Sequence, residues 1–138
     1  MKTLFLSAHT YMLVIFIAAS ALSSCTKSQD AKLPDMTFKS GGNYTSSNKS
    51  VTTSEIISVG ITADKNKADL KTYKIYSATG NGSFSLKKTF NLTADETDHY
   101  ENDYQFHPES KNNFETWKFE ITDVDGNSNS VSIKLTVN

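Results

Sequence analysis

The sequence predicts an all-β domain, arranged as a two-layer antiparallel sandwich of about seven strands. From Asp35 onward apolar residues recur with a period of two, and turn residues interrupt this pattern at short intervals. No amphipathic helical segment of useful length occurs. About seven short strands in roughly one hundred residues are typical of a sandwich, and a small, partly open β-barrel is the alternative.

The clearest strand signal lies near the carboxyl end. Trp117, Phe119 and Ile121 alternate with polar residues across 115–123, which predicts a strand with one buried face. The apolar set of a second run, 130–137, is Val131, Ile133, Leu135 and Val137. Because the DVDGNSN segment between the runs contains the Asp-Gly and Asn residues of hairpin turns, we expect the two runs to form an antiparallel hairpin.

Five further strands are predicted from shorter patterns. They cover about 36–39, 57–61, 73–75, 84–92 and 100–106. Asn81 and Gly82 join the third and fourth of these, which is a second hairpin signal. The fourth is expected to bury one face that carries Phe84, Leu86, Phe90 and Leu92. Lys88 falls on the same face, as an inward-pointing charge that discourages further pairing of an edge strand.

The charge of the chain argues against nucleic acid as a ligand. All 14 basic residues are lysines, 15 residues are acidic, and the formal net charge is -1. Phosphate recognition favours clustered lysine and arginine, and this sequence contains no arginine. No phosphate-loop or dinucleotide-binding motif occurs, so we expect neither a nucleic-acid partner nor a cofactor.

Residues 1–24 have the order of a secretory signal peptide. Lys2 precedes an apolar run over 11–19, and small residues follow. A helix needs about twenty apolar residues to cross a bilayer, which is about twice the length of this run. The segment therefore predicts a cleaved signal rather than a permanent membrane-spanning anchor.

The end of this segment resembles the bacterial lipobox, in which an aliphatic residue and two small residues precede a cysteine. The four matching positions are Leu22, Ser23, Ser24 and Cys25. The resemblance implies cleavage before Cys25, acyl chains such as palmitate on this cysteine, and the lipid bilayer as a partner. Lipidation also explains the only cysteine of the chain, which would otherwise be an unpaired thiol in an oxidising compartment. Thr26 stands where an aspartate tends to mark inner-membrane retention, which implies the outer membrane, on either its surface or its periplasmic face.

Residues 25–34, which begin with the lipidated cysteine, are predicted to form a tether, and the folded domain is expected to occupy 35–138. The segment after Cys25 is polar, with one proline and no apolar period. Fully extended, it reaches about 30 Å. A partner of the domain would therefore have to come close to the membrane.

Two acidic segments contain candidate metal ligands. Asp95, Glu96 and Asp98 offer the oxygen atoms that calcium prefers, although a solvated loop explains the same residues. The DVDGN segment at 123–127 resembles the start of an EF-hand loop. Its glycine is in the fourth position instead of the sixth, and no glutamate closes the loop, so we expect an ordinary hairpin turn.

The sequence contains no recognisable catalytic motif. His99 and His107 are the only histidines after the signal segment, and neither belongs to a nucleophile or metal-hydrolase pattern. Catalysis would require one of them to lie beside a carboxylate in a deep pocket. We therefore expect a protein that is not an enzyme.

The segment 117–137 resembles the last two strands of bacterial immunoglobulin-like domains, with fibronectin type III domains as near relatives. The shared features are an aromatic-rich strand, the DxDGN turn and a V-x-I-x-L-x-V strand. The chain departs from the antibody pattern because it lacks an intersheet cysteine pair and carries its only tryptophan, Trp117, in the penultimate strand. The resemblance implies an immunoglobulin-like sandwich.

Such a domain on a short tether is expected to be a non-catalytic module of the cell envelope that binds a protein or a glycan. Exposed aromatic rings are typical of such binding faces, and Tyr44, Tyr76 and Phe114 fall in loops or outside the inward phase. A structural spacer or accessory subunit of an envelope complex, with no ligand of its own, is the alternative. Sandwich folds carry both roles, so the fold class does not choose between them.

Overall fold

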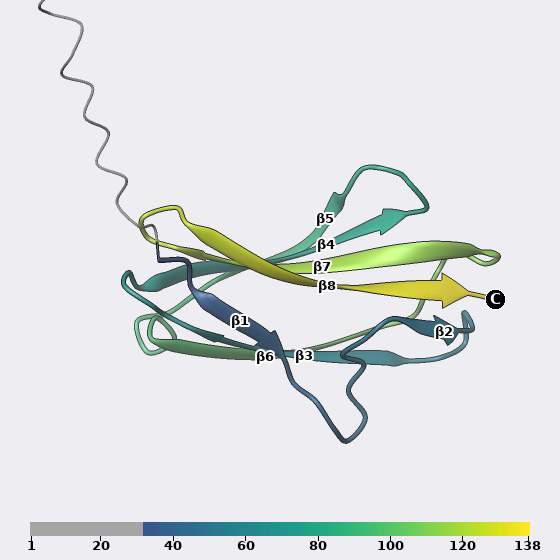
Figure 1. The fold of residues 1–138 in the computed structure, drawn as a ribbon, viewed down its shortest axis with the longest axis horizontal. Coiled ribbons are helices and arrows are strands. Elements are labelled where there is room, and N and C mark those ends of the chain that lie inside the picture. Colours follow the sequence, from purple (N-terminus) through teal and green to yellow (C-terminus); the bar gives the residue numbers. More distant parts are fainter. Residues whose placement is uncertain (1–31) are drawn as a thin grey trace, which may run out of the picture. The chain divides into compact units, whose positions relative to one another are not determined.

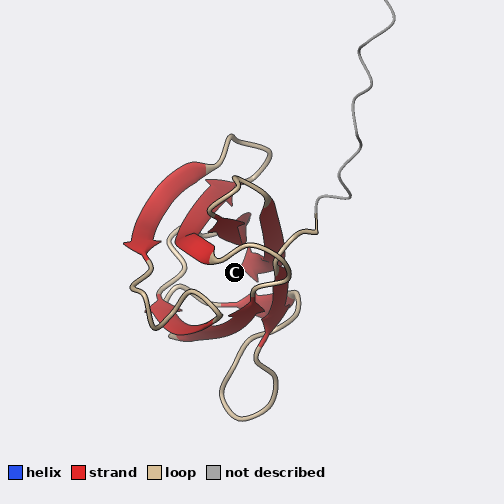
Figure 2. Cartoon of the chain, turned by 90° about the vertical axis from the view of Figure 1, so that its left-hand side faces the viewer, coloured by secondary structure: helices blue, strands red, loops and turns tan. Residues whose placement is uncertain are grey.

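The computed structural model describes residues 32–138, which form two facing β-sheets with no helix (Figure 1 and Figure 2). The strands are β1 Asp35–Phe38, β2 Lys49–Val51, β3 Ile57–Asp64, β4 Leu70–Thr79, β5 Ser85–Asn91, β6 His99–Phe106, β7 Asn113–Asp123 and β8 Ser128–Val137. One sheet has the order β1-β3-β6 and the other the order β2-β8-β7-β4-β5, and neither closes on itself. The predicted all-β sandwich is confirmed, and the barrel alternative is wrong.

The chain crosses between the two sheets in the manner of a Greek-key sandwich. β4 and β5 form one hairpin of the five-stranded sheet, and β7 and β8 form another. The three-stranded sheet is assembled from β1, β3 and β6. In the chain, β2 lies between β1 and β3, and the β4–β5 hairpin lies between β3 and β6. Such crossings between two sheets are typical of β-sandwiches. Every strand pairing is antiparallel except that of β2 with β8.

β2 is absent from the sequence prediction of about seven strands. It contains three residues, of which only Val51 is buried. A strand this short does not show a period of two, and its parallel partners, Leu135 to Val137, are distant in the sequence. The seven predicted strands all occur, with bounds that shift by a few residues.

The core lies between the two sheets and follows the predicted alternation. Phe119 and Ile121 are fully buried, and Trp117 is nearly so. From the facing sheet, the ring of Phe106 stacks on the ring of Trp117 with their centroids 3.7 Å apart. The described residues contain no cysteine, and this aromatic contact joins β6 and β7 across the two layers.

The predicted buried face of β5 is wrong in the first half of that strand. Phe84 and Leu86 are 46% and 56% exposed. Phe90 and Leu92 are partly buried and pack against the core, as predicted. The two halves of the apolar set therefore lie on opposite faces of the sheet.

A β-bulge causes this reversal. Lys88 lies opposite Ile75, whereas Leu86 lies opposite Tyr76, so Lys87 is an extra residue in the pairing of β5 with β4. One extra residue changes the phase of a strand whose side chains alternate between faces. β5 is an edge strand, as predicted, and Lys88 lies opposite a core residue of β4.

The predicted hairpin turn between β7 and β8 is confirmed. Asp123 is buried, and its carboxylate oxygens accept hydrogen bonds from the backbone N–H and the side-chain amide of Asn127, at 2.8 and 3.0 Å. Gly126 has a φ of 87°, a left-handed conformation that glycine adopts without strain. Both oxygens of Asp123 therefore hold the turn closed.

The chain enters the sandwich at the end that carries the β7–β8 turn. Pro34, the last residue of the predicted tether, is buried, and its carbonyl accepts a hydrogen bond from the Asn129 side chain at 2.9 Å. The predicted signal segment, the lipobox and Cys25 lie outside the described residues. Among residues 32–138 no helix is long and apolar enough to cross a membrane.

Candidate functional site

The outer faces of the two sheets differ in charge. The outward positions of β1, β3 and β6 carry the carboxylates of Asp35, Asp64, Glu101 and Asp103. The outward positions of β4, β7 and β8 carry Lys74, Lys118 and Lys134, together with Glu120. The two faces are therefore separate candidates for ligand binding.

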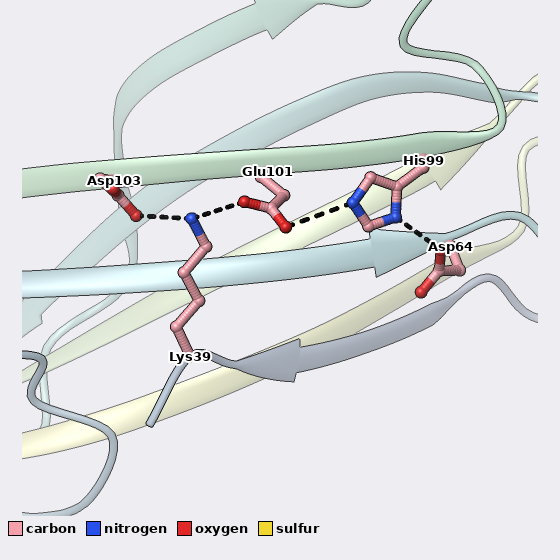
Figure 3. A network of polar contacts seen from close by, with 5 residues as sticks. All are labelled: Lys39, Asp64, His99, Glu101 and Asp103. Carbon is pink, nitrogen blue, oxygen red and sulfur yellow. Dashed lines mark hydrogen bonds and ion pairs between the residues drawn. The ribbon is translucent and has the colours of Figure 1, made fainter. Parts of the chain in front are cut away.

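A chain of polar contacts runs across the three-stranded sheet (Figure 3). His99 Nδ1 lies 2.7 Å from Asp64 Oδ1, and His99 Nε2 lies 3.3 Å from Glu101 Oε1. Lys39 Nζ then lies 2.8 Å from Glu101 Oε2 and 3.0 Å from Asp103 Oδ1. We call these five residues the charged network. All of them lie on the open surface of the sheet, with cations and carboxylates in alternation.

Strand alternation and one glycine position the charged network. Because side chains of a strand alternate between faces, His99, Glu101 and Asp103 of β6 all point outward. Gly60 of β3 lies opposite Asp103, and a Cβ there would be 2.7 Å from Lys39 Cδ. The absence of a side chain at Gly60 therefore lets Lys39 cross β3 and reach β6.

Contacts in and beside the charged network shift the pKa values of His99, Glu101 and Asp103 in favour of their ionised forms. Hydrogen bonds to Asp64 and then to Glu101 raise the pKa of His99 above its ordinary value of 6.5. Contacts with Lys39 and then His99 lower the pKa of Glu101, and contacts with Tyr44 and then Lys39 lower that of Asp103. The network is therefore a set of mutually stabilised charges.

Replacing Asp64 with asparagine is expected to lower the pKa of His99. The substitution removes the carboxylate that contributes most to the raised pKa of the imidazole. His99 gains stability from its protonated form, so its contribution is fully present below pH 6.5 and is lost as the pH rises through the folded pKa. An NMR titration of the histidine ring signals measures the shift. Asp125→Asn, in the β7–β8 turn, is the control, and an unchanged His99 pKa in Asp64→Asn would contradict the assignment.

The candidate calcium ligands do not converge on one point. Asp95 Oδ1 accepts a hydrogen bond from the Thr93 hydroxyl at 2.6 Å, and Glu96 Oε2 accepts one from the Thr93 backbone N–H at 2.8 Å. Asp98 forms an ion pair with Lys65 instead. Within the part of the chain that the structure describes, no three or more His, Cys, Asp or Glu side chains are placed to hold a metal ion.

Both histidines of the described residues lie on exposed parts of the surface. His107 is an exposed residue that follows β6. His99 does lie beside two carboxylates, but on an open strand surface where its side chain is 51% exposed. One open depression is lined by residues of the 42–49 loop with Ile56, and another by residues around Phe114; neither lining includes a histidine.

The three aromatic residues of the predicted ligand face do not form one cluster. Tyr44 lies on the three-stranded sheet, where its hydroxyl donates a hydrogen bond to Asp103 Oδ2 at 2.8 Å. Tyr76 of β4 and Phe114 of β7 both point outward from the five-stranded sheet. The structure thus brings two of the three to one face and places the third on the opposite face.

Tyr76 and Phe114 are each accompanied by a lysine. The Lys118 ammonium lies 4.3 Å from the centroid of the Tyr76 ring and 5.5 Å from that of Phe84. The Lys134 ammonium lies 3.7 Å from the centroid of the Phe114 ring. We define the distal patch as this set of outward-facing residues of the five-stranded sheet: Tyr76, Phe84, Leu86, Phe114, Lys118 and Lys134.

An open depression adjoins the distal patch. It has a volume of about 470 Å³, and Phe114 and Lys134 of the patch are among the residues that line it. Ala78, on the outward phase of β4 opposite Thr116, is only 6% exposed. The patch therefore ends at a depression on its Phe114 side.

No protein-family model matches the chain, and a search of curated proteins found no similar sequence. What the structure defines is the class of fold: a two-sheet sandwich with a charged network on one face and an aromatic–lysine patch on the other.

Proposed function

We propose that this protein is a non-catalytic, lipid-anchored binding module of the bacterial cell envelope, which captures a protein or glycan close to the outer membrane. The observation that carries the proposal is the distal patch. Phe84 and Leu86 are large apolar side chains that are about half exposed, and they adjoin the outward-facing Tyr76. Scattered apolar residues on a surface are ordinary, whereas a gathered apolar set rimmed by charge is typical of an interaction site.

The position of the distal patch supports a partner that lies away from the bilayer. Pro34, where the described chain enters the sandwich, bonds to Asn129, which is opposite Ile121 of β7. Phe114 lies seven residues along the same strand, a distance of about 23 Å. With Cys25 in the bilayer, the partner would meet the end of β7 that lies far from the point where the chain enters the sandwich.

Replacing Cys25 with serine is expected to abolish membrane association. The thiol is the site of acyl attachment in proteins with a lipobox, and several acyl chains make anchoring stable. In cells fed an alkyne-labelled fatty acid, the parent chain takes up label and partitions into the detergent phase, and Cys25→Ser does neither. Ser28→Ala, just after the lipobox, is the control. Label retained by Cys25→Ser would contradict the anchoring proposal.

The binding role is tested with arrays of glycans and of envelope proteins. The full chain, extracted from membranes in detergent, is expected to bind at least one array component, and Phe84→Ser/Leu86→Ser is expected to lose that binding. Both substitutions replace exposed side chains, so the fold is expected to persist. A parent chain that binds nothing on either array would favour the spacer role. Protease treatment of intact cells then decides between the surface and the periplasmic face.

A further inference from the structure

We infer that the distal patch binds an acidic polysaccharide, a chain of sugars that carry carboxylate or sulfate groups. This inference rests on the proposed binding function and names the chemical class of its ligand. It is carried by the charge of the patch, by the arrangement of its rings and by the depression beside Phe114.

Charge complementarity favours an anionic partner. Lys118 and Lys134 lie within the patch, and Lys74 points outward from β4 beside it. The one carboxylate on the outward positions of these strands, Glu120, is engaged within the protein. It accepts hydrogen bonds from the Tyr76 hydroxyl at 3.2 Å and from Lys118 Nζ at 2.7 Å. Lys118 is thus already paired with Glu120. Lys74 and Lys134 are the lysines of this face that an anionic chain would meet.

The opposite sheet strengthens this choice of face. Its outward positions carry four carboxylates, and its two cations, Lys39 and His99, are already paired with three of them. An anionic polymer is repelled by such a surface and attracted by the lysines of the five-stranded sheet. The five-stranded sheet is therefore the face of the sandwich that favours an anionic polymer.

The aromatic rings of the patch are spaced for an extended ligand. Phe84 directly precedes β5, Tyr76 lies on β4 and Phe114 lies on β7, and these three strands are neighbours in one sheet. Strands are about 4.8 Å apart, so the patch from Phe84 across to Lys134 on β8 spans about 14 Å. Each ring offers an apolar surface on which a sugar ring can stack. The Lys134 ammonium lies over Phe114 and is available for an acidic substituent, whereas Tyr76 and Phe84 share Lys118, which is paired with Glu120.

The depression beside Phe114 offers the polar groups that sugar hydroxyls require. Its lining combines Phe114 and Lys134 with the amide side chains of Asn112, Asn113 and Asn138. An amide side chain can both donate and accept hydrogen bonds, as a hydroxyl group does. One aromatic ring, one ammonium group and several amides thus surround a single open space.

The composition of the patch disfavours a protein partner and a bilayer. The centres of protein–protein interfaces are depleted in lysine and enriched in arginine, whereas here lysines accompany the rings and the chain has no arginine. A bilayer reached through the tether would approach from the Pro34 end, and the Phe114 depression lies at the other end of β7. A polysaccharide fits both the lysine-rich composition of the patch and the position of the Phe114 depression.

The inference is tested with polygalacturonate immobilised on a biosensor surface and the full lipidated chain in detergent. We expect binding that weakens as salt is raised, because the charges are exposed to solvent. Phe114→Ser and Lys134→Gln are each expected to weaken binding about tenfold, the effect of losing one hydrogen bond to a charged group or one stacking contact. Lys67→Gln, with the same charge change at an exposed residue between β3 and β4, should bind as the parent does. Thermal unfolding confirms that each variant is folded.

The outcomes separate this inference from the proposed function. Binding of polygalacturonate, with neutral dextran, polyglutamate and single-stranded DNA bound at least tenfold more weakly, supports the inference. Equal binding of polyglutamate or DNA overturns the inference, because the site would then recognise negative charge and not a sugar chain. No binding of polygalacturonate, with binding of some other array component, overturns the inference and leaves the proposed function standing. No binding of anything overturns both.

Discussion

Replacing Trp117 with alanine is expected to lower the free energy of unfolding by about 3–5 kcal/mol, as is usual for a large aromatic side chain removed from a core. Trp117 is 5% exposed, and its ring stacks on that of Phe106 from the other sheet. Its indole N–H also donates a hydrogen bond to Glu115 Oε2 at 2.9 Å. The substitution therefore opens a cavity between the layers and removes a donor from a buried carboxylate.

Phe114→Ala is the matched control, because Phe114 is an aromatic residue of the same strand that points outward. We expect it to cost about 1 kcal/mol or less, which corresponds to one exposed cation–π contact with Lys134. Urea unfolding, followed by circular dichroism, measures both variants. Equal losses in the two variants would show that the alternation of β7 does not direct Trp117 into the core.

Replacing Glu115 with glutamine is expected to cost about 2 kcal/mol at neutral pH, because hydrogen bonds to a charged acceptor are lost within a buried site. Glu115 is 4% exposed. Its Oε1 accepts hydrogen bonds from the backbone N–H groups of Glu109 and Ser110, at 2.6 and 2.7 Å. The NH₂ group of a glutamine side chain at this position would face either the Trp117 indole N–H or the backbone N–H groups of Glu109 and Ser110, so it would meet donors only. The carboxylate of Glu115 thus fastens the loop between β6 and β7 to the core.

The cost of Glu115→Gln is expected to shrink in acid. Burial by itself raises the pKa of Glu115, but the hydrogen bonds from Trp117, Glu109 and Ser110 outweigh it and hold the pKa below the ordinary value of 4.5. The stabilisation by the carboxylate is therefore complete above pH 4.5 and is lost as the pH falls through the folded pKa. Urea midpoints of parent and variant should converge below pH 4.5. A constant difference between them would contradict the assignment.

The fold class could be predicted because most strands bury one face only. In β7 and β8 every second residue faces the core, and the turn between them carries a glycine where a left-handed conformation is needed. The bulge in β5 could not be predicted, because an extra residue leaves no trace in a polar–apolar pattern and appears only in the pairing with β4. β2 was missed for the related reason that its partner strand lies far along the chain.

The candidate site was predictable in part. The outward phase of Phe114, Lys118 and Lys134 follows from the alternation of β7 and β8. The sequence does not show that Tyr44 belongs to the other sheet, since that placement depends on a contact with Asp103, fifty-nine residues away. Phe84 and Leu86 were assigned to the core because the bulge was hidden. The alternation of apolar and polar residues therefore could not predict that Phe84 and Leu86 are exposed.

The place of β8 between β2 and β7 has a consequence for the order in which the domain can form. Synthesis delivers β2 and β7 before β8, and until β8 arrives β2 has no neighbour in the five-stranded sheet. The last link is a hydrogen bond from the Asn138 backbone N–H to the Val51 carbonyl, at 2.9 Å. Closure of the sheet thus joins segments more than eighty residues apart, a pairing that carries a large loop-closure cost and is expected to be slow. The other strands can pair as they emerge, whereas β2 joins the five-stranded sheet only when the final strand is free to pair.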